Sequence, residues 1–322
     1  MRARAGDPPR TMPQKVLAAR TADPLLRGDE VQVKVDQVIL SRSPARVLSH
    51  ALALGLKKSP VEVAVAYDGA CVTDALIHQQ RASGASATVP PEALHHSVLI
   101  GRPGVGFPAP LHLERFASPA RLAVTDDPRL SFTGGLGMLC FVLPPSHLAA
   151  ALTTGSVALR PPRSVQILLS GKMRPFVCAR DVALELLRGG LAEVVRRIDQ
   201  RFGAPVVLEF AGPSAKLLSV PERAVLCAIA PTVGAASAVF ISDEKCEAFL
   251  RDQRRSKAHR ALFPDAGAPC DDVVSLDIAT VDPLLMDANG EIKPVRDMAG
   301  TPIHQVILGG DSGMTLRDML AA

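Results

Sequence analysis

The chain has 322 residues, of which 48% are hydrophobic and 21% charged, and its formal net charge is +4. This composition is typical of a globular protein, and the length is sufficient for two α/β domains or one large one. Aromatic residues make up only 3% of the chain, with no tryptophan and one tyrosine, Tyr67. Because no platform for base stacking and no basic stripe is found, the composition excludes nucleic acid as an expected partner.

The six cysteines lie far apart, form no Cys-x-x-Cys pair and mostly fall in apolar runs, as Cys140 and Cys227 do. Buried free thiols are expected there, which favours a reducing, cytoplasmic compartment. No signal peptide and no run of about 18 apolar residues is found, so the sequence predicts no contact with a membrane. Residues 1–12, rich in arginine and proline, are expected to be a disordered leader.

Helical and strand patterns alternate along the first half of the chain. Residues 31–40 alternate as one strand, and residues 43–54 predict a helix with Gly55 just past its end, where a C-cap glycine is expected. The other expected elements are a helix over residues 13–20, strands over 61–66 and 122–124, a helix over 70–83 and a loop over 88–110.

The second half begins after a boundary at residues 160–162. Leu191, Val194, Val195 and Ile198 have the i, i+3, i+4, i+7 spacing of an amphipathic helix. Strands are expected over residues 165–169, 206–210, 273–278 and 303–308, and a helix over 316–321.

One stretch, residues 123–137, carries the clearest functional pattern. A short apolar strand runs into the polar turn 125–129, and a glycine-rich segment, residues 133–137, follows. This order is how α/β proteins place reactive side chains at the carboxyl end of a sheet. On the local pattern alone, a solvated loop closed by glycine remains an alternative.

The same stretch resembles a motif of the aconitase/isopropylmalate isomerase family, which reads roughly G-x-D-S-H-T-x-T-x-G-A-L-G and continues with L-A-x-x-L-A-T-G. Residues 148–155, LAAALTTG, supply the second half at the expected distance. Asp127 matches the aspartate of the motif, but Pro128 stands at its serine and Arg129 at its histidine. The framework is present and the chemical groups have been exchanged.

Further blocks in the same order extend the resemblance over about residues 13–322. It implies an α/β, aconitase-like fold of two lobes with mostly parallel sheets flanked by helices. The first lobe would span residues 13–163 and the second 164–268, and a return segment, 269–322, would pack on the first lobe.

Other positions that carry chemistry in the family are also exchanged here. Asp68 is kept at one strand end, but Gly69 replaces a catalytic histidine and Thr232 a catalytic glutamate. Ala109 stands at the position of another histidine. His112 lies nearby, although a histidine at a loop edge is more often a surface residue.

Asp311 takes the position of the cysteine in the family's G-S-C-T-N-G, the first ligand of its [4Fe–4S] cluster. Because the chain ends nine residues after Gly313, the other cluster cysteines are expected to be absent, and the sequence predicts no metal and no cofactor. Residues 309–313 are interpreted as an anion seat, with Ser312 as a nucleophile the alternative.

Two classes of function follow. The first is a cluster-independent, repurposed enzyme, a lyase or isomerase. It would move protons on a small carboxylate-bearing metabolite by elimination, isomerisation or cyclisation, in a bacterial specialised-metabolite pathway. The second is a non-catalytic subunit that regulates or scaffolds an active partner. We favour the enzyme, because drift in an abandoned pocket tends to fill it with apolar side chains, and charged groups stand here instead.

The expected partners are a small acidic metabolite and either a second copy of the chain or a partner subunit. The predicted site residues mostly follow strands. The catalytic candidates are Asp68, Asp127, Thr232, Asp311 and Ser312, and the substrate-binding candidates are Ser41, Arg42, Arg129, Gly310 and Gly313.

Overall fold

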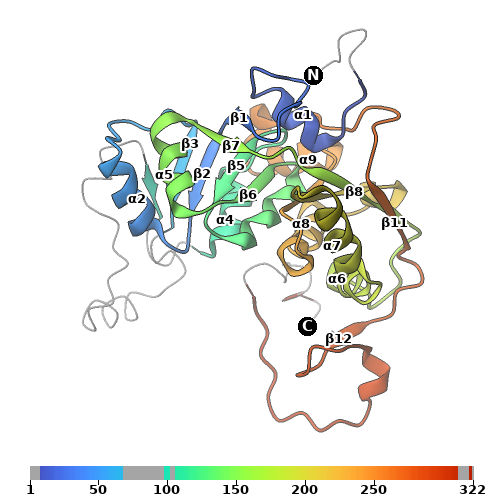
Figure 1. Ribbon diagram of the computed structural model, residues 1–322. Helices are drawn as coiled ribbons and strands as arrows, with labels where there is room; N and C mark the ends of the chain where they lie inside the picture. The colour runs from blue at the N-terminus through green and yellow to red at the C-terminus, as the bar shows by residue number, and fades with distance from the viewer. Residues whose placement is uncertain (1–7, 68–97, 102–105, 311–318, 321–322) are drawn as a thin grey trace.

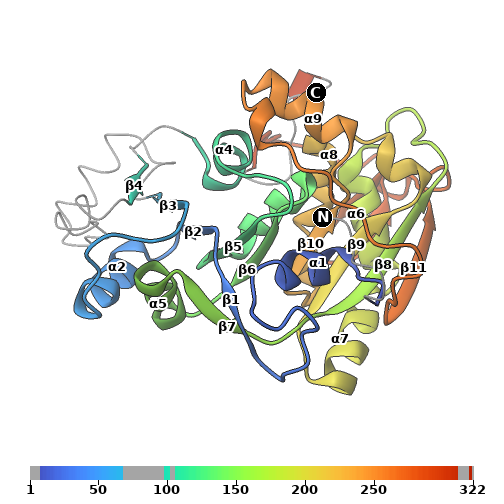
Figure 2. The ribbon, with the colours of Figure 1, turned by 90° about the horizontal axis from the view of Figure 1, so that it is seen from above.

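Two parallel β-sheets form the centre of the molecule, which the computed structural model describes over residues 8–67, 98–101, 106–310 and 319–320 (Figure 1). Strands and helices alternate along most of the chain, and both sheets are covered by helices (Figure 2). The expected α/β class is therefore confirmed.

The first sheet has the strand order β4-β3-β2-β5-β6, and every neighbouring pair is parallel. Val38 and Leu40 pack in one apolar layer with helices α2 and α5, whereas Ile39 packs in another with α4 and the 3-10 helix η2. Such a sheet is apolar on both faces because helices cover both. Its elements are β2 (Gln37–Leu40), α2 (Pro44–Ala53), β3 (Val63–Ala66), β4 (Leu99–Ile100), α4 (Pro108–Arg115), β5 (Leu122–Thr125), η2 (Pro128–Leu136), β6 (Leu139–Val142) and α5 (Pro145–Thr154).

The second sheet has the order β10-β9-β8-β11 and is also parallel throughout. Leu208 of β9 packs in the layer with α6, α7 and α8, whereas Val207 packs in the layer with α1. Its elements are α1 (Met12–Ala18), β8 (Arg163–Ser170), α6 (Ala179–Arg188), α7 (Leu191–Phe202), β9 (Val206–Ala211), η3 (Pro213–Lys216), α8 (Val220–Cys227), η4 (Ala230–Val233), β10 (Ser237–Phe240), α9 (Glu244–Asp252), η5 (Ser256–Ala258) and β11 (Asp272–Asp277).

The two lobes share their interior. One apolar cluster joins Ala123 of the first sheet to Val165 of the second, and the other joins Val38 to Val207. Edge strands β6 and β10 lie together, where the backbone N–H of Cys140 donates to Ser237 Oγ at 3.3 Å. The lobes are therefore two sheets built around a common core.

The glycine-rich segment of the central stretch belongs to η2 and is buried against the second lobe. A Cβ on Gly134 would lie 1.9 Å from the carbonyl oxygen of Ala238, and one on Gly135 would lie 2.4 Å from the backbone nitrogen of Ala224. Only glycine permits this approach of two backbones. The interpretation as a solvated loop is wrong.

The single strand expected over residues 31–40 is two strands in different sheets. β1 (Val31–Lys34) pairs antiparallel with β7 (Ser156–Leu159), and β2 lies in the first parallel sheet. The chain breaks at buried Asp36, which accepts hydrogen bonds from Arg20 Nε, from Arg121 Nη1 and from the backbone N–H of Leu122. These partners are up to 86 residues away, so the local pattern cannot reveal the break.

The carboxyl-terminal part also differs from expectation. The strand predicted to return to the first lobe is β11, which pairs with β8 in the second sheet. Residues 303–308 form no strand; they are extended and exposed, and Ile307 is 84% exposed. Between β11 and residues 303–308 the chain forms a hairpin of β12 (Leu284–Met286) and β13 (Ile292–Pro294), followed by η6 (Val295–Met298).

Most other elements agree with the sequence patterns, including Gly55 after α2 at φ +85°. The leader expected over residues 1–12 is wrong at its end, because Thr11 caps α1 and Met12 is fully buried; residues 1–7 lie outside the described residues. The loop expected over residues 88–110 contains β4 and the start of α4, and the helix over 70–83 lies outside the described residues. In the described part of the chain, no helix has the length and apolarity needed to cross a bilayer.

Candidate functional site

The strand order of the first sheet reverses between β2 and β5, since β3 and β4 extend to one side and β6 to the other. In open α/β sheets, ligands bind outside the carboxyl ends of the strands at such a switch point. The segments that leave these two strands are residues 41–43 and 126–129. They contain four of the predicted site residues.

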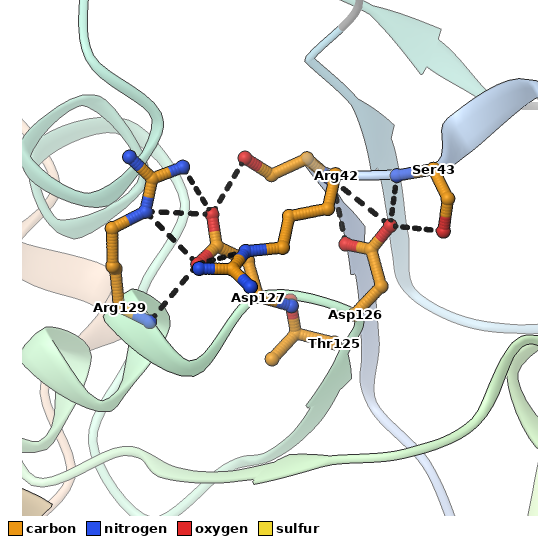
Figure 3. Close-up of polar contacts among 7 residues, drawn as sticks. Arg42, Ser43, Thr125, Asp126, Asp127 and Arg129 are labelled. Atoms are coloured by element: carbon orange, nitrogen blue, oxygen red, sulfur yellow. Dashed lines mark hydrogen bonds and ion pairs between the residues drawn. The ribbon is translucent and has the colours of Figure 1, made fainter. Parts of the chain in front are cut away.

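Asp126 fixes the segment after β2. Its Oδ1 accepts from the backbone N–H of Ser41 at 2.7 Å, and its Oδ2 accepts from the backbone N–H groups of Arg42 at 3.1 Å and Ser43 at 2.6 Å (Figure 3). These donors precede α2, a position that attracts anions. The carboxylate of Asp126 therefore fills an anion site from within the protein and joins the two segments.

Asp127 is fully buried and receives the side chains of three predicted site residues (Figure 3). Arg129 Nε lies 3.0 Å from both carboxylate oxygens, and its Nη2 lies 2.6 Å from Oδ2. Ser41 Oγ donates to Oδ2 at 2.9 Å, and Arg42 Nε lies 3.5 Å from Oδ1. Asp127, Ser41, Arg42 and Arg129 are called the Asp127 cluster below.

The contacts of Asp127 decide its protonation. Burial opposes ionisation, but the hydrogen bonds from Arg129 and Ser41 outweigh it and lower the pKa of the carboxyl below its ordinary value. Asp127 is thus ionised at neutral pH with both oxygens occupied. This geometry fits a residue that orients the two arginines better than a group that accepts a proton.

The cluster carries a net positive charge, because Arg42 and Arg129 share one carboxylate. The Arg42 side chain is 57% exposed, and its two Nη groups donate no hydrogen bond to another described residue. A guanidinium fork suits a carboxylate. Arg42 is therefore the member best placed to receive an anionic ligand from solvent.

The remaining predicted site residues do not join this cluster in the described part of the chain. Thr232 lies on η4 and is exposed, and no hydrogen bond joins it to Asp127. Gly310 is exposed. Asp68, Asp311, Ser312 and Gly313 lie outside the described residues.

His112 is fully buried on α4, so the expectation of a surface residue is wrong. Its Nδ1 lies 3.0 Å from the hydroxyl of Tyr67 and its Nε2 lies 2.8 Å from Gln37 Oε1. Because Oε1 can only accept, Nε2 carries the proton and Nδ1 accepts from Tyr67. Burial, with the nearby positive charge of Arg255, lowers the pKa of His112 to about 3, so the ring is neutral. No pattern in the sequence indicates this network, which joins the residue after β3 to α4 and β2 beside the site.

The described cysteines do not fit an iron–sulfur cluster. Cys140, Cys227 and Cys246 are buried, and burial raises the pKa of each thiol, to about 12 for Cys140. Cluster ligands are thiolates that converge on one point. Among the residues with described positions, no three His, Cys, Asp or Glu side chains are grouped as metal ligands would be.

The fold and the site define an α/β protein of two parallel sheets with an arginine-rich anion site at a switch point. The profile of the aconitase family (aconitate hydratase) matches residues 35–298, and the chain belongs to this family. The matched range contains both parallel sheets and the Asp127 cluster.

Individual relatives agree with this assignment. The chain is 26% identical to 3-isopropylmalate dehydratase large subunit 2 of Archaeoglobus fulgidus, over 97% of this chain and 73% of the relative. It is 28% identical to the 3-isopropylmalate dehydratase large subunit of Desulfosudis oleivorans, over 69% of this chain and 52% of the relative. It is 26% identical to the 3-isopropylmalate dehydratase large subunit of Sulfurimonas denitrificans, over 63% of this chain and 48% of the relative. The chain thus spans from about half to about three quarters of the length of these relatives.

Proposed function

We propose that the chain is a repurposed aconitase-family enzyme that binds a small carboxylate-bearing metabolite at the Asp127 cluster. The observation that carries this proposal is that Arg42 and Arg129 meet on one buried carboxylate at the switch point of the first sheet. Arg42 would hold a substrate carboxylate with its Nη groups, while Asp127 orients the guanidinium through Nε.

The proposed reaction is a proton transfer next to the bound carboxylate, as in elimination, isomerisation or cyclisation. The names of the family and of the relatives, aconitate hydratase and 3-isopropylmalate dehydratase, support a hydro-lyase type of chemistry. Asp68 is the proposed proton acceptor, because in the sequence it comes two residues after the last residue of β3, the strand beside β2. The reaction is proposed to need no cluster, since the described thiols do not fit one.

The test is binding and proton exchange with a panel of di- and tricarboxylates that includes aconitate and 3-isopropylmalate. Calorimetry gives the affinity, and NMR in D2O follows exchange of the carbon-bound protons. Arg42→Ala should weaken binding by roughly 10- to 150-fold, the range for a charge-assisted hydrogen bond. Exposed Arg46, in the first turn of α2, gives the matched control Arg46→Ala, which should leave binding unchanged.

A panel without any binding would reject the carboxylate site. Binding without proton exchange would reject the enzyme and leave a carboxylate-binding, non-catalytic protein.

One observation favours a second candidate, a subunit that regulates or scaffolds a protein partner. Residues 303–308 expose Ile303, Val306 and Ile307, each by more than 65%. Large exposed apolar side chains close together are typical of interaction surfaces. Mass measurement in solution tests this candidate, because Ile307→Lys should then dissociate an assembly that the unaltered chain forms.

A further inference from the structure

A cavity of about 850 Å3 lies at the opposite, amino end of the first sheet. Asp36, which lines it, precedes β2, whereas Ser41 of the Asp127 cluster follows the same strand. At about 3.3 Å per residue, these positions are roughly 16 Å apart. The cavity is therefore separate from the proposed carboxylate site.

Four chain segments form the cavity. They are helix α1 with the turn after it, Lys34 and Asp36 ahead of β2, residues 119–121 ahead of β5, and residues 260–263 after η5. The first three belong to the amino-terminal half and the fourth to the second lobe. A ligand in the cavity would contact both lobes.

The lining is strongly basic. Its charged members are five cations and one carboxylate, namely Lys15, Arg20, Lys34, Arg121, Arg260 and Asp36. Asp36 pairs with Arg20 and Arg121. Asp265 and Glu62, which do not line the cavity, pair with Lys15 and Arg121. Five positive charges thus face three negative ones.

Lys34 and Arg260 are the lining cations that no carboxylate of the described residues neutralises. Lys34 is exposed, and within the described residues its ammonium has no hydrogen-bond or ion-pair partner. Arg260 donates Nη1 to the carbonyl oxygens of Lys257 and His259 and contacts no carboxylate in the described chain. Two uncompensated positive charges line one cavity.

Apart from Thr21, the rest of the lining is apolar and includes Val16, Ala19, Pro119, Ala120, Leu262 and Phe263. We propose that this cavity binds a small molecule with a dianionic head group, a phosphate monoester or a dicarboxylate, attached to an apolar body. Lys34 and Arg260 match the charge of the head group, and the apolar wall matches the body. The volume is within the range of about 300–1,000 Å3 that small-molecule sites occupy.

The test uses the full chain with four probes: inorganic phosphate, n-butyl phosphate, succinate and butyrate. Calorimetry and thermal unfolding report binding, because a ligand of the folded state raises the melting temperature. We expect n-butyl phosphate or succinate to bind more tightly than butyrate, and n-butyl phosphate more tightly than inorganic phosphate. Comparison of n-butyl phosphate with succinate identifies the head group.

Lys34→Ala and Arg260→Ala should each weaken that binding about tenfold or more, as loss of a charge-assisted contact does. Arg180→Ala, at an exposed position on α6, keeps the same net charge as these variants and should bind as the unaltered chain does. Arg42→Ala should leave the binding of n-butyl phosphate unchanged, whereas succinate, as a dicarboxylate, is also a candidate ligand of the Asp127 cluster; the phosphate probe therefore separates this cavity from that cluster.

The proposal is overturned if no dianion binds up to about 10 mM, well above the millimolar affinity expected for a weak ligand. Equal losses of affinity for the dianion in Lys34→Ala and Arg180→Ala would also overturn the proposal, since they would show that the net charge of the protein alone attracts the dianion. Loss in Arg42→Ala alone would assign the binding to the other site.

Discussion

Arg129 turns back onto Asp127, two residues before it, and contacts both carboxylate oxygens with its side chain and Oδ1 with its backbone N–H. The same carboxylate caps η2, the buried helix that packs the first lobe against the second. The residue in the position of the family's histidine is therefore tied to the start of η2. Arg129 contributes to the structure of the site as well as to its charge.

Arg129→Ala should lower the free energy of unfolding by about 1–3 kcal/mol, because it removes the main partner of a buried carboxylate. Arg129→Lys should recover only part of the loss, since an ammonium cannot form the fork. Urea denaturation measures both. In a double-mutant cycle with Asp127→Asn, the double variant should lose less free energy of unfolding than the sum of the two single variants. Additive losses would show that the interaction between Arg129 and Asp127 does not stabilise the protein.

The stability that Asp127 provides should depend on pH. Its pKa in the folded state is lowered below the ordinary 3.8, so its contribution is complete above about pH 5 and is lost as the pH falls through the folded value. The stability difference between the unaltered chain and Asp127→Asn should therefore be constant near neutrality and shrink in acid. A difference that stays constant down to about pH 2 would mean that the carboxylate is not stabilised by its neighbours.

The sequence could predict that Ser41, Arg42, Asp127 and Arg129 meet, because each follows a strand and neighbouring parallel strands end at one edge. It could not predict that Asp127 is saturated by its neighbours. That depends on the side-chain conformation of Arg129, which the pattern of residue types does not record. Thr232 is a predicted site residue that does not meet the others. It matches a catalytic position of a family motif, but in the described chain it lies on η4 and not in the Asp127 cluster.

The apolar patterns predicted strands correctly where another strand lies beside the segment, and wrongly where the described structure has no such neighbour. Residues 206–210 became β9 between two parallel neighbours, whereas residues 303–308, equally apolar, have no neighbouring strand in the described residues. A strand needs the backbone of another segment, and the local pattern does not contain it. The split at Asp36 has the same cause, a partner far along the chain.

Gly135→Ala should destabilise the protein by about 3 kcal/mol, at the upper end for an overpacked core, because the new Cβ meets the backbone of α8. Gly309→Ala is the control, since nothing lies within 4 Å of its added Cβ. Thermal unfolding compares the two variants. Equal melting temperatures would show that η2 and α8 separate easily and that the lobes are not closely joined there.

Arg223 and Asp243 form a buried ion pair in the second lobe, with Nη1 2.9 Å from Oδ1 and Nη2 2.8 Å from Oδ2. Arg223→Met should lower the free energy of unfolding by about 3–5 kcal/mol, because it leaves a buried carboxylate without its partner. Arg180→Met, an exposed change of the same type, should stay within about 0.5 kcal/mol. Chemical denaturation of both variants at neutral pH makes the comparison, and equal losses would contradict a structural role for the pair.

Glu209 is a buried carboxyl on β9 that faces the start of α1. Its Oε2 accepts from the backbone N–H of Met12 at 2.9 Å, and its Oε1 has no hydrogen-bond partner in the described structure. Burial raises the pKa of this carboxyl above its ordinary 4.5. The folded state therefore holds the proton more tightly than the unfolded state, and the protein should lose stability from this group as the pH rises above 4.5.

Glu209→Gln removes this titration while keeping an oxygen that can accept from Met12. The free energy of unfolding of the unaltered chain, relative to that of the variant, should fall as the pH rises from about 4. The fall should stop once the pH is above the pKa of Glu209 in the folded state. Each unit by which the folded pKa exceeds 4.5 corresponds to about 1.4 kcal/mol. Urea denaturation at a series of pH values measures the slope, and Glu193→Gln, an exposed change on α7, corrects for the loss of a charge. A relative stability that rises with pH would mean that the amino end of α1 stabilises the charged carboxylate more than burial opposes it.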